Sequence, residues 1–174
     1  MTTSSYHSGQ IIQEVNLSVE QGNSWNTSSS SFSNAGGDPA WQYDYSGNPY
    51  ASFSPTPSPC RLPRVDFQAH YASSIITVQY TVSMRSDNSA GYARFRTFDL
   101  NANVRKSPNA YCGHSGYYEN DGAWTEYTIR DAFIAGTTNV MKLEIQVMCA
   151  SSGQIIFGWS GSDQRLMTVR EIAK

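Results

Sequence analysis

Two segments of the chain alternate between apolar and polar residues over most of their length. In residues 74–85 the apolar residues at alternate positions are Ile76, Val78, Tyr80, Val82 and Met84. In residues 140–149 they are Met141, Leu143, Ile145, Val147 and Cys149. Because successive side chains of a strand point to opposite faces, this alternation predicts two half-buried antiparallel strands whose apolar sides form the core.

Shorter segments with the same period lie along the rest of the chain. We expect strands at residues 10–19, 64–71, 75–85, 91–99, 123–130, 140–149, 154–159 and 165–172. In the first of them, Ile11, Val15, Leu17 and Val19 are expected to share the inner face. Residues 131–134 are compatible with a single helical turn. Eight or nine short strands separated by turn signals predict an all-β fold, an antiparallel β-sandwich of the jelly-roll type.

Residues 35–63 interrupt this pattern. The segment holds six of the seven prolines of the chain together with five aromatic residues. Proline cannot donate to a strand ladder, so we expect an irregular loop, and its aromatic content argues against disorder. The chain is therefore interpreted as one β-sandwich domain, residues 1–174, with an N-terminal arm at residues 1–8 and an inserted loop at residues 35–63.

Charge and composition exclude several classes of function. Fourteen acidic and twelve basic residues give a net charge of −2, and only 15% of residues are charged. Binding to nucleic acid or to an anionic membrane requires a basic face, so neither is expected. No run approaches the ~20 apolar residues of a membrane span. The first ten residues lack the cationic and apolar regions of a secretory signal, so we expect synthesis in the cytoplasm.

The candidate reactive residues do not form a recognisable catalytic or metal site. Ser115 and Ser160 lie in sequences that begin like a hydrolase nucleophile elbow, but the closing glycine and the following helix are missing, which favours loop turns. Cys112 and His114 lack the spacing of a zinc site. The three cysteines are too few for a disulfide framework; Cys149 is expected to be a buried thiol, and pairing of Cys60 with Cys112 stays open. We therefore expect no enzyme, no metal and no cofactor.

Aromatic residues are the strongest candidates for binding. They gather in residues 35–63 and near residues 111–118, and the candidate partner-binding set is Trp41, Tyr43, Tyr45, Tyr50, Phe53, Tyr117 and Tyr118. Exposed tyrosine and tryptophan supply large contact area between proteins at low entropic cost. The same residues would also suit sugar stacking, or would cover the ends of the protein's own core. Contact between protein subunits is the interpretation we favour.

Three segments together resemble a known class of proteins. They are GQIIQEVN at residues 9–16, SSIITVQYTVSMR at residues 73–85 and RLMTVREIA at residues 165–173, with the link AGTTN at residues 135–139. Their order resembles the small β-sandwich domains at the ends of bacteriophage tail fibres and related virion appendages. The resemblance implies a homotrimer within a virion, and against it residues 35–63 look inserted.

The resemblance and the composition together predict a structural role in a phage particle. The favoured hypothesis is a capsid decoration (cement) protein that stabilises the head by contacting the major capsid protein through its arm and loop. A receptor-binding tip of a tail fibre that recognises the host surface is the first alternative. A carbohydrate-binding module that takes a host-surface glycan is the second.

Overall fold

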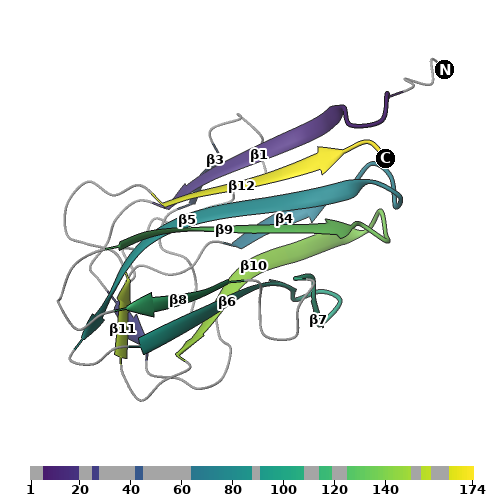
Figure 1. Ribbon diagram of the computed structural model, residues 1–174. Helices are drawn as coiled ribbons and strands as arrows, with labels where there is room; N and C mark the ends of the chain where they lie inside the picture. The colour runs from purple at the N-terminus through teal and green to yellow at the C-terminus, as the bar shows by residue number, and fades with distance from the viewer. Residues whose placement is uncertain are drawn as a thin grey trace.

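The computed structural model describes residues 6–19, 25–27, 42–44, 64–87, 91–107, 114–118, 125–149, 154–157 and 165–174. The regular structure in these ranges consists of strands alone (Figure 1). They are β1 (Ile11–Val19), β2 (Trp25–Thr27), β3 (Gln42–Asp44), β4 (Arg64–Gln68), β5 (Ile75–Asp87), β6 (Gly91–Asp99), β7 (Val104–Arg105), β8 (His114–Tyr118), β9 (Thr125–Ile134), β10 (Val140–Cys149), β11 (Gln154–Phe157) and β12 (Arg165–Ile172). The predicted all-β class is confirmed, and no helix in the described ranges is suited to cross a membrane.

The strands form two antiparallel sheets with the connectivity of a jelly roll. In the first sheet the main order is β9-β5-β12-β1, with β3 beside β1, and β11 and β2 added along the far part of β5. In the second sheet the order is β4-β10-β6-β8, with β7 also beside β6. The chain passes between the two sheets so that sequence neighbours such as β4 and β5 lie in different layers, which is the double Greek key of a jelly roll. The predicted sandwich is therefore confirmed in its topology.

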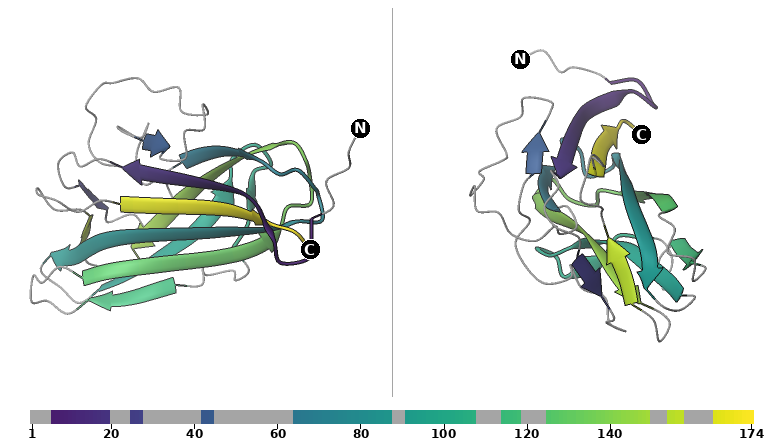
Figure 2. Two further views of the ribbon diagram at one scale, coloured as in Figure 1. Left: turned by 90° about the horizontal axis from the view of Figure 1, so that it is seen from above. Right: turned by 90° about the vertical axis from the view of Figure 1, so that its left-hand side faces the viewer.

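Both described chain ends lie at one end of the sandwich, which we call the terminal end (Figures 1 and 2). There β1 begins beside the last residues of β12, because Ile11 is opposite Ile172. The opposite end carries the last residues of β1 and the first residues of β6.

The core lies between the sheets, where the alternation predicted it. Ile76 and Val78 of β5 face Leu143, Ile145 and Val147 of β10, and all five side chains are at most 1% exposed. Tyr80 and Met141 belong to the same buried cluster. The side chains of Val82, Met84 and Cys149, also expected in the core, lie outside the described side chains.

The inner face predicted for the first strand is wrong at Ile11. Val15 points inward and is 3% exposed, whereas Ile11 is 51% exposed. The cause is a β-bulge. Ile11 pairs with Ile172 but Gln13 pairs with Glu171, so β1 contains one extra residue, Ile12, relative to β12. A one-residue slip exchanges the two faces of a strand, and Ile11 is therefore turned to the outside.

The helical turn considered for residues 131–134 is also wrong. These residues extend β9, which pairs with β5 continuously from Thr125 opposite Met84 to Ile134 opposite Ile75. The long strand β5 offers a hydrogen-bonding partner to each of them, and this overrides a weak local preference. Two further predictions need refinement, because residues 42–44 of the expected irregular loop form β3, and the expected turn around Ser115 lies in β8.

A buried polar group joins the two sheets. Asp131 of β9 is 5% exposed, and its Oδ2 accepts hydrogen bonds from Thr97 Oγ1 of β6 at 2.6 Å and from Ser107 Oγ at 2.8 Å. The Thr97 backbone N–H donates to Ser107 Oγ at 2.8 Å. Asp131 Oδ2 and the hydroxyls of Thr97 and Ser107 thus each have a partner, which is the condition for burying them without loss of stability.

Removing this link is expected to destabilise the fold moderately. Asp131→Ala leaves the hydroxyls of Thr97 and Ser107 without their acceptor, and we expect the free energy of unfolding to fall by about 2 kcal/mol. Urea denaturation followed by tryptophan fluorescence measures the change. The control is Asp66→Ala, because Asp66 is an exposed carboxylate on β4. Equal midpoints for the two variants would contradict the role assigned to Asp131.

Candidate interaction surface

The predicted aromatic site is described only in part. Tyr43 lies in β3, with its backbone opposite Ser18 of β1. Tyr117 and Tyr118 lie in β8, opposite residues 92 and 91 of β6. Their side chains, and the predicted site residues Trp41, Tyr45, Tyr50 and Phe53, lie outside what the structure describes.

The backbone places these two groups of aromatic residues at one end but on different sheets. β3 pairs with the last three residues of β1, and β8 pairs with the first five residues of β6. Both positions are away from the terminal end. β3 continues the first sheet beyond β1, whereas β8 adjoins β6 in the second sheet. The aromatic strands therefore do not share one sheet face.

A different surface emerges from the register of the first sheet. Ile11 is opposite Ile172, Ile172 is opposite Ile75, and Ile75 is opposite Ile134. One isoleucine from each of β1, β12, β5 and β9 thus stands in a single line across the strands. We call Ile11, Ile172, Ile75 and Ile134 the isoleucine row.

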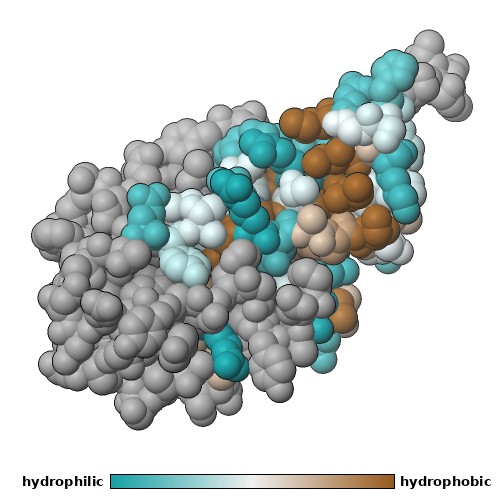
Figure 3. Space-filling view, viewed as in Figure 1, coloured by the Kyte–Doolittle hydropathy of each residue, from teal (hydrophilic) through white to brown (hydrophobic). Residues whose placement is uncertain are grey.

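The isoleucine row faces outward at the terminal end. Ile134 is 46% exposed and Ile11 is 51% exposed, at the two ends of the row, while Ile75 and Ile172 between them are half-buried. With strands about 4.8 Å apart, the row is about 14 Å long. Figure 3 shows the apolar surface gathered at this end. Exposed apolar residues in one contiguous line are more informative than the same residues scattered singly.

The other described side chains of this sheet face are mostly polar. Next to the row, Arg170 of β12 donates from Nε to Glu14 of β1, and this bond is the main cause that lowers the pKa of Glu14. Further along, Thr168 Oγ1 donates to Asn16 Oδ1 at 2.7 Å. Thr81 and Thr128 share a hydrogen bond of 3.0 Å between β5 and β9. Among the described side chains of this face, the large exposed apolar ones therefore lie at the terminal end.

A buried carboxylate lies directly beneath the row. Glu171 precedes Ile172 in β12 and points inward, with no exposed surface. Its two oxygens accept hydrogen bonds from the backbone N–H groups of His70, at 2.9 and 3.0 Å, and Tyr71, at 3.1 Å. Gln13 Nε2 donates to it at 2.8 Å, and the His70 ring nitrogen Nδ1 lies 2.9 Å from Oε2. We call Glu171 with these partners and Ser74 the Glu171 clasp.

The hydrogen bonds keep Glu171 ionised despite its burial. Burial by itself raises the pKa of the carboxyl group, because the charged form loses water. The donors from the backbone and ring of His70, from Ser74 and from Gln13 outweigh this effect and lower the pKa of Glu171 to about 2. The clasp is therefore a charged carboxylate held by charge-assisted hydrogen bonds, the stronger kind in proteins.

The clasp fixes the strand ends that carry the row. Ser74 precedes Ile75, and its carbonyl accepts from the N–H of Ala135, the residue after Ile134, at 2.9 Å. Glu171 precedes Ile172, and Gln13 follows the bulge that turns Ile11 outward. Each isoleucine of the row is thus within two residues of an anchored position. Hydrogen bonds at these inward-facing positions hold the strand ends in register. The neighbouring isoleucines therefore point outward from an anchored backbone.

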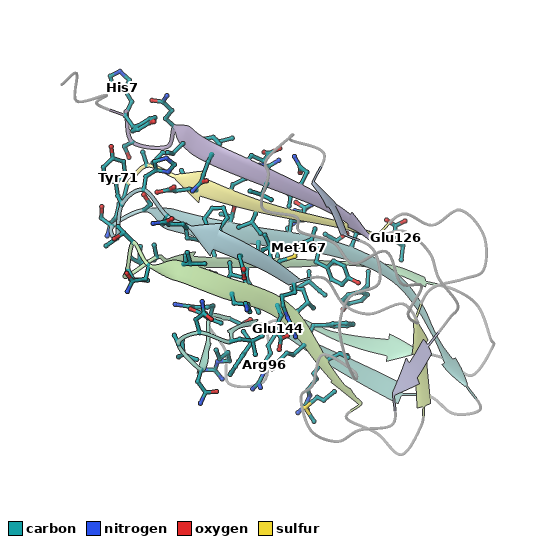
Figure 4. All side chains as sticks on the ribbon, turned by 180° about the vertical axis from the view of Figure 1, so that it is seen from behind. His7, Tyr71, Arg96, Glu126, Glu144 and Met167 are labelled. Carbon is teal, nitrogen blue, oxygen red and sulfur yellow. The ribbon has the colours of Figure 1, made fainter. Side chains whose placement is uncertain are left out.

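The N-terminal residues are fastened to the same end. Gly9, with φ of 83°, forms a turn in which its N–H donates to the Ala173 carbonyl at 2.8 Å, and the Ala173 N–H donates to the Gln10 carbonyl at 2.8 Å. The ring of Tyr6 contacts Tyr71 edge to face, with centroids 6.1 Å apart. Figure 4 shows Tyr71 and His7 at this end. Tyr6, from the predicted arm, and Gly9 thus each contact the strands and loops of the terminal end.

The remaining candidate ligands are dispersed or engaged. Among the residues that the structure describes, no group of three His, Cys, Asp or Glu side chains could hold a metal ion. Asp99 is buried, and its Oδ1 accepts from the backbone N–H groups of Asn101 at 3.1 Å and Lys142 at 3.2 Å. Cys60 and Cys112 lie outside the described residues.

Sequence reasoning missed the isoleucine row because its members are far apart in the chain. Each of them reads locally as one more apolar residue at the end of a strand. Only the pairing register, including the bulge at Ile12, brings them into line. A signal was present in the repeated pairing of a polar or small residue with isoleucine, in Ser74-Ile75, Ile134-Ala135 and Glu171-Ile172.

Comparison with known proteins gives only distant likenesses. No protein-family model matches the sequence, and no curated protein sequence matches it. Among solved structures, the Eiger TNF of S. frugiperda is 8% identical with a TM-score of 0.46, each chain being covered to 94%. The CBM22-1 xylan-binding domain of Paenibacillus barcinonensis Xyn10C is 9% identical with a TM-score of 0.38, covering 98% of this chain and 99% of its own. An infectious bursal disease virus Gx strain structure is 8% identical with a TM-score of 0.30, covering 99% of this chain and 58% of its own.

Proposed function

We propose that this chain is a non-enzymatic structural component of a bacteriophage virion, and specifically a capsid decoration protein. The observation that carries the proposal is the isoleucine row on its rigid support. A monomeric domain gains nothing from holding an apolar line in water, whereas an assembly surface needs one. Such a surface suits a structural protein that assembles with other protein subunits.

The three segments that carry the sequence resemblance lie side by side in the fold. These segments, residues 9–16, 73–85 and 165–173, include most of β1, β5 and β12, which are neighbours in one sheet. Their polar positions Gln13, Ser74 and Glu171 meet in the clasp. The resemblance to virion appendages therefore concerns one contiguous structural unit, and this unit is the one that presents the row.

The use of the buried carboxylates also supports a structural role. Glu171 anchors the loop between β4 and β5, Asp131 joins the two sheets, and Asp99 holds the backbone after β6. Catalytic acids and bases must instead face a site that substrate can enter. These three carboxylates are engaged in holding the fold.

The two ends of the sandwich suit two different contacts. The isoleucine row lies at the terminal end, and the aromatic strands β3 and β8 lie toward the other. In the proposed function the terminal end joins protein subunits to one another. The opposite end, where β3 and β8 lie, contacts the major capsid protein.

Binding to empty phage heads tests this function. Purified protein is expected to co-sediment with heads that lack it and to raise the temperature at which they rupture. A variant in which residues 35–63 are replaced by a short glycine-serine linker is expected to keep its melting transition but to lose head binding. Binding of the intact protein to host cells, or to a purified surface polysaccharide, with no binding to heads would contradict the decoration role and favour a fibre tip or a carbohydrate-binding module.

A further inference from the structure

We propose that the isoleucine row is the contact between two copies of this chain, packed row against row about a two-fold axis. The inference deepens the proposed function, because it names the partner of the terminal end. Only the biological role of this contact depends on the proposed function. The row, its register and its exposure are features of the single chain.

The charge around the row favours a second copy as the occupant. None of the four isoleucines carries a charge, and the charges next to the row on β1 and β12, Glu14 and Arg170, form an ion pair with each other. Further along the same face β9 exposes one charge of each sign, Arg130 and Glu126. These charges balance in sign, so two identical surfaces meet without a net like-charge repulsion, whereas a strongly charged partner would find no net complementary charge on this face. A surface that is complementary to itself forms an isologous contact, and such a contact closes with two copies.

The dimensions of the sheet face agree with a contact between proteins. Four strands about 4.8 Å apart and about ten residues long offer a face of roughly 600 Å². One partner contributes about 800 Å² to a standard interface, so the face alone supplies about three quarters of that area. The row supplies the apolar part of this face, at its terminal end, and the uncharged residues Asn16, Thr81 and Thr128 supply part of its polar remainder.

The row is also prepared for docking. Isoleucine is branched at Cβ and has few rotamers to lose, and the Glu171 clasp already fixes the strand ends. A surface that is ordered before it binds avoids most of the entropic cost of ordering side chains at an interface. Aspartate in place of an exposed member should therefore act through the contact and leave the fold intact.

One arrangement of the pair also accounts for the two ends of the molecule. Stacked sheets keep their strands within about 30° of one another. A two-fold axis along the strands places Ile11 of one copy against Ile134 of the other and leaves the opposite ends of both copies pointing the same way. Both copies can then approach a single surface, as a decoration protein must. This pair differs from the trimer that the sequence resemblance implies.

The mass of the protein in solution tests the inference. Sedimentation and light scattering of the full chain over a wide concentration range are expected to show a dimer. Ile134→Asp and Ile11→Asp are each expected to raise its dissociation constant roughly 30-fold or more, the effect of losing an interface residue of central importance. The control is Val104→Asp, because Val104 is an apolar side chain of similar exposure, 42%, on β7 of the other sheet. It is expected to leave the dimer unchanged.

Several results would overturn the inference. A monomer at all concentrations, a trimer, or a dimer that both row variants leave intact would each do so. Thermal melting of each variant shows whether it is folded, and Ile134→Thr, a milder and still β-branched change, serves if the aspartate variants are not. The measurement uses the protein alone, so a monomer that still binds heads would reject the pair and keep the proposed function, and a dimer that ignores heads would do the reverse.

Discussion

Glu171→Ala is expected to lower the free energy of unfolding by about 4 kcal/mol, the largest effect of any single substitution considered for this chain. The substitution removes the acceptor of the His70 and Tyr71 backbone N–H groups and of the Gln13 side chain. These donors lie close to the terminal end, where water cannot replace a carboxylate without opening the structure. Removing one partner of a buried charged network is strongly destabilising, because the other partners remain buried and unsatisfied. Replacing the whole network by apolar residues would cost less free energy of unfolding.

Urea denaturation measures this loss of stability, and two further variants serve for comparison. Glu126→Ala removes an exposed carboxylate from β9 and is expected to change the free energy of unfolding by less than about 0.5 kcal/mol. Glu171→Gln keeps the shape of the side chain but offers one acceptor oxygen in place of two, so its cost should be intermediate. If Glu171→Ala were as stable as Glu126→Ala, the clasp would not be holding the terminal end.

The same substitution bears on the proposed contact between copies. The clasp anchors Ser74 and Gln13 as well as Glu171, and these residues adjoin three members of the isoleucine row. Without the clasp the strand ends that carry the isoleucine row should be less ordered. Both the stability of the dimer and the free energy of unfolding should therefore fall. Ile134→Asp should weaken the dimer alone. The two variants therefore separate the support of the surface from the surface itself.

Much of the fold could be predicted because the alternation of apolar and polar residues is local. Ile76, Val78, Leu143 and Ile145 each occupy the inner face that a period of two assigns to them. The residues 131–134 could not be placed in the same way. Their extended structure depends on β5, whose sequence lies more than forty residues away and runs long enough to pair with all of β9.

The candidate surface required information that no local pattern holds. Ile11 faces outward because β1 has a bulge at Ile12, and the bulge is defined only by the pairing with β12. Glu171 was within reach of sequence reasoning, because Met167, Val169 and Glu171 occupy alternate inward positions of β12 and a charge among them is exceptional. A carboxylate at such a position indicates a buried network, although its partners at His70 and Gln13 come from distant parts of the chain.

Acid is expected to destabilise the protein through Glu171 by about 3 kcal/mol as the pH falls from 4.5 to about 2. The folded protein lowers the pKa of Glu171 from 4.5 to about 2, so the native carboxyl group binds a proton less readily than the unfolded one. The clasp therefore contributes its full stability above pH 4.5, and this contribution is lost as the pH falls toward the folded value.

The Glu171→Gln variant isolates this contribution. The variant cannot titrate at position 171, so the difference in unfolding free energy between wild type and variant should be greatest above pH 5 and should shrink by about 3 kcal/mol toward pH 2. Urea denaturation at a series of pH values measures that difference, and other acidic groups, including Glu14 with its lowered pKa, cancel in the subtraction. A difference that stayed constant across the range would show that the native carboxyl group titrates like the unfolded one, and the charged clasp would have to be abandoned as the support of the isoleucine row.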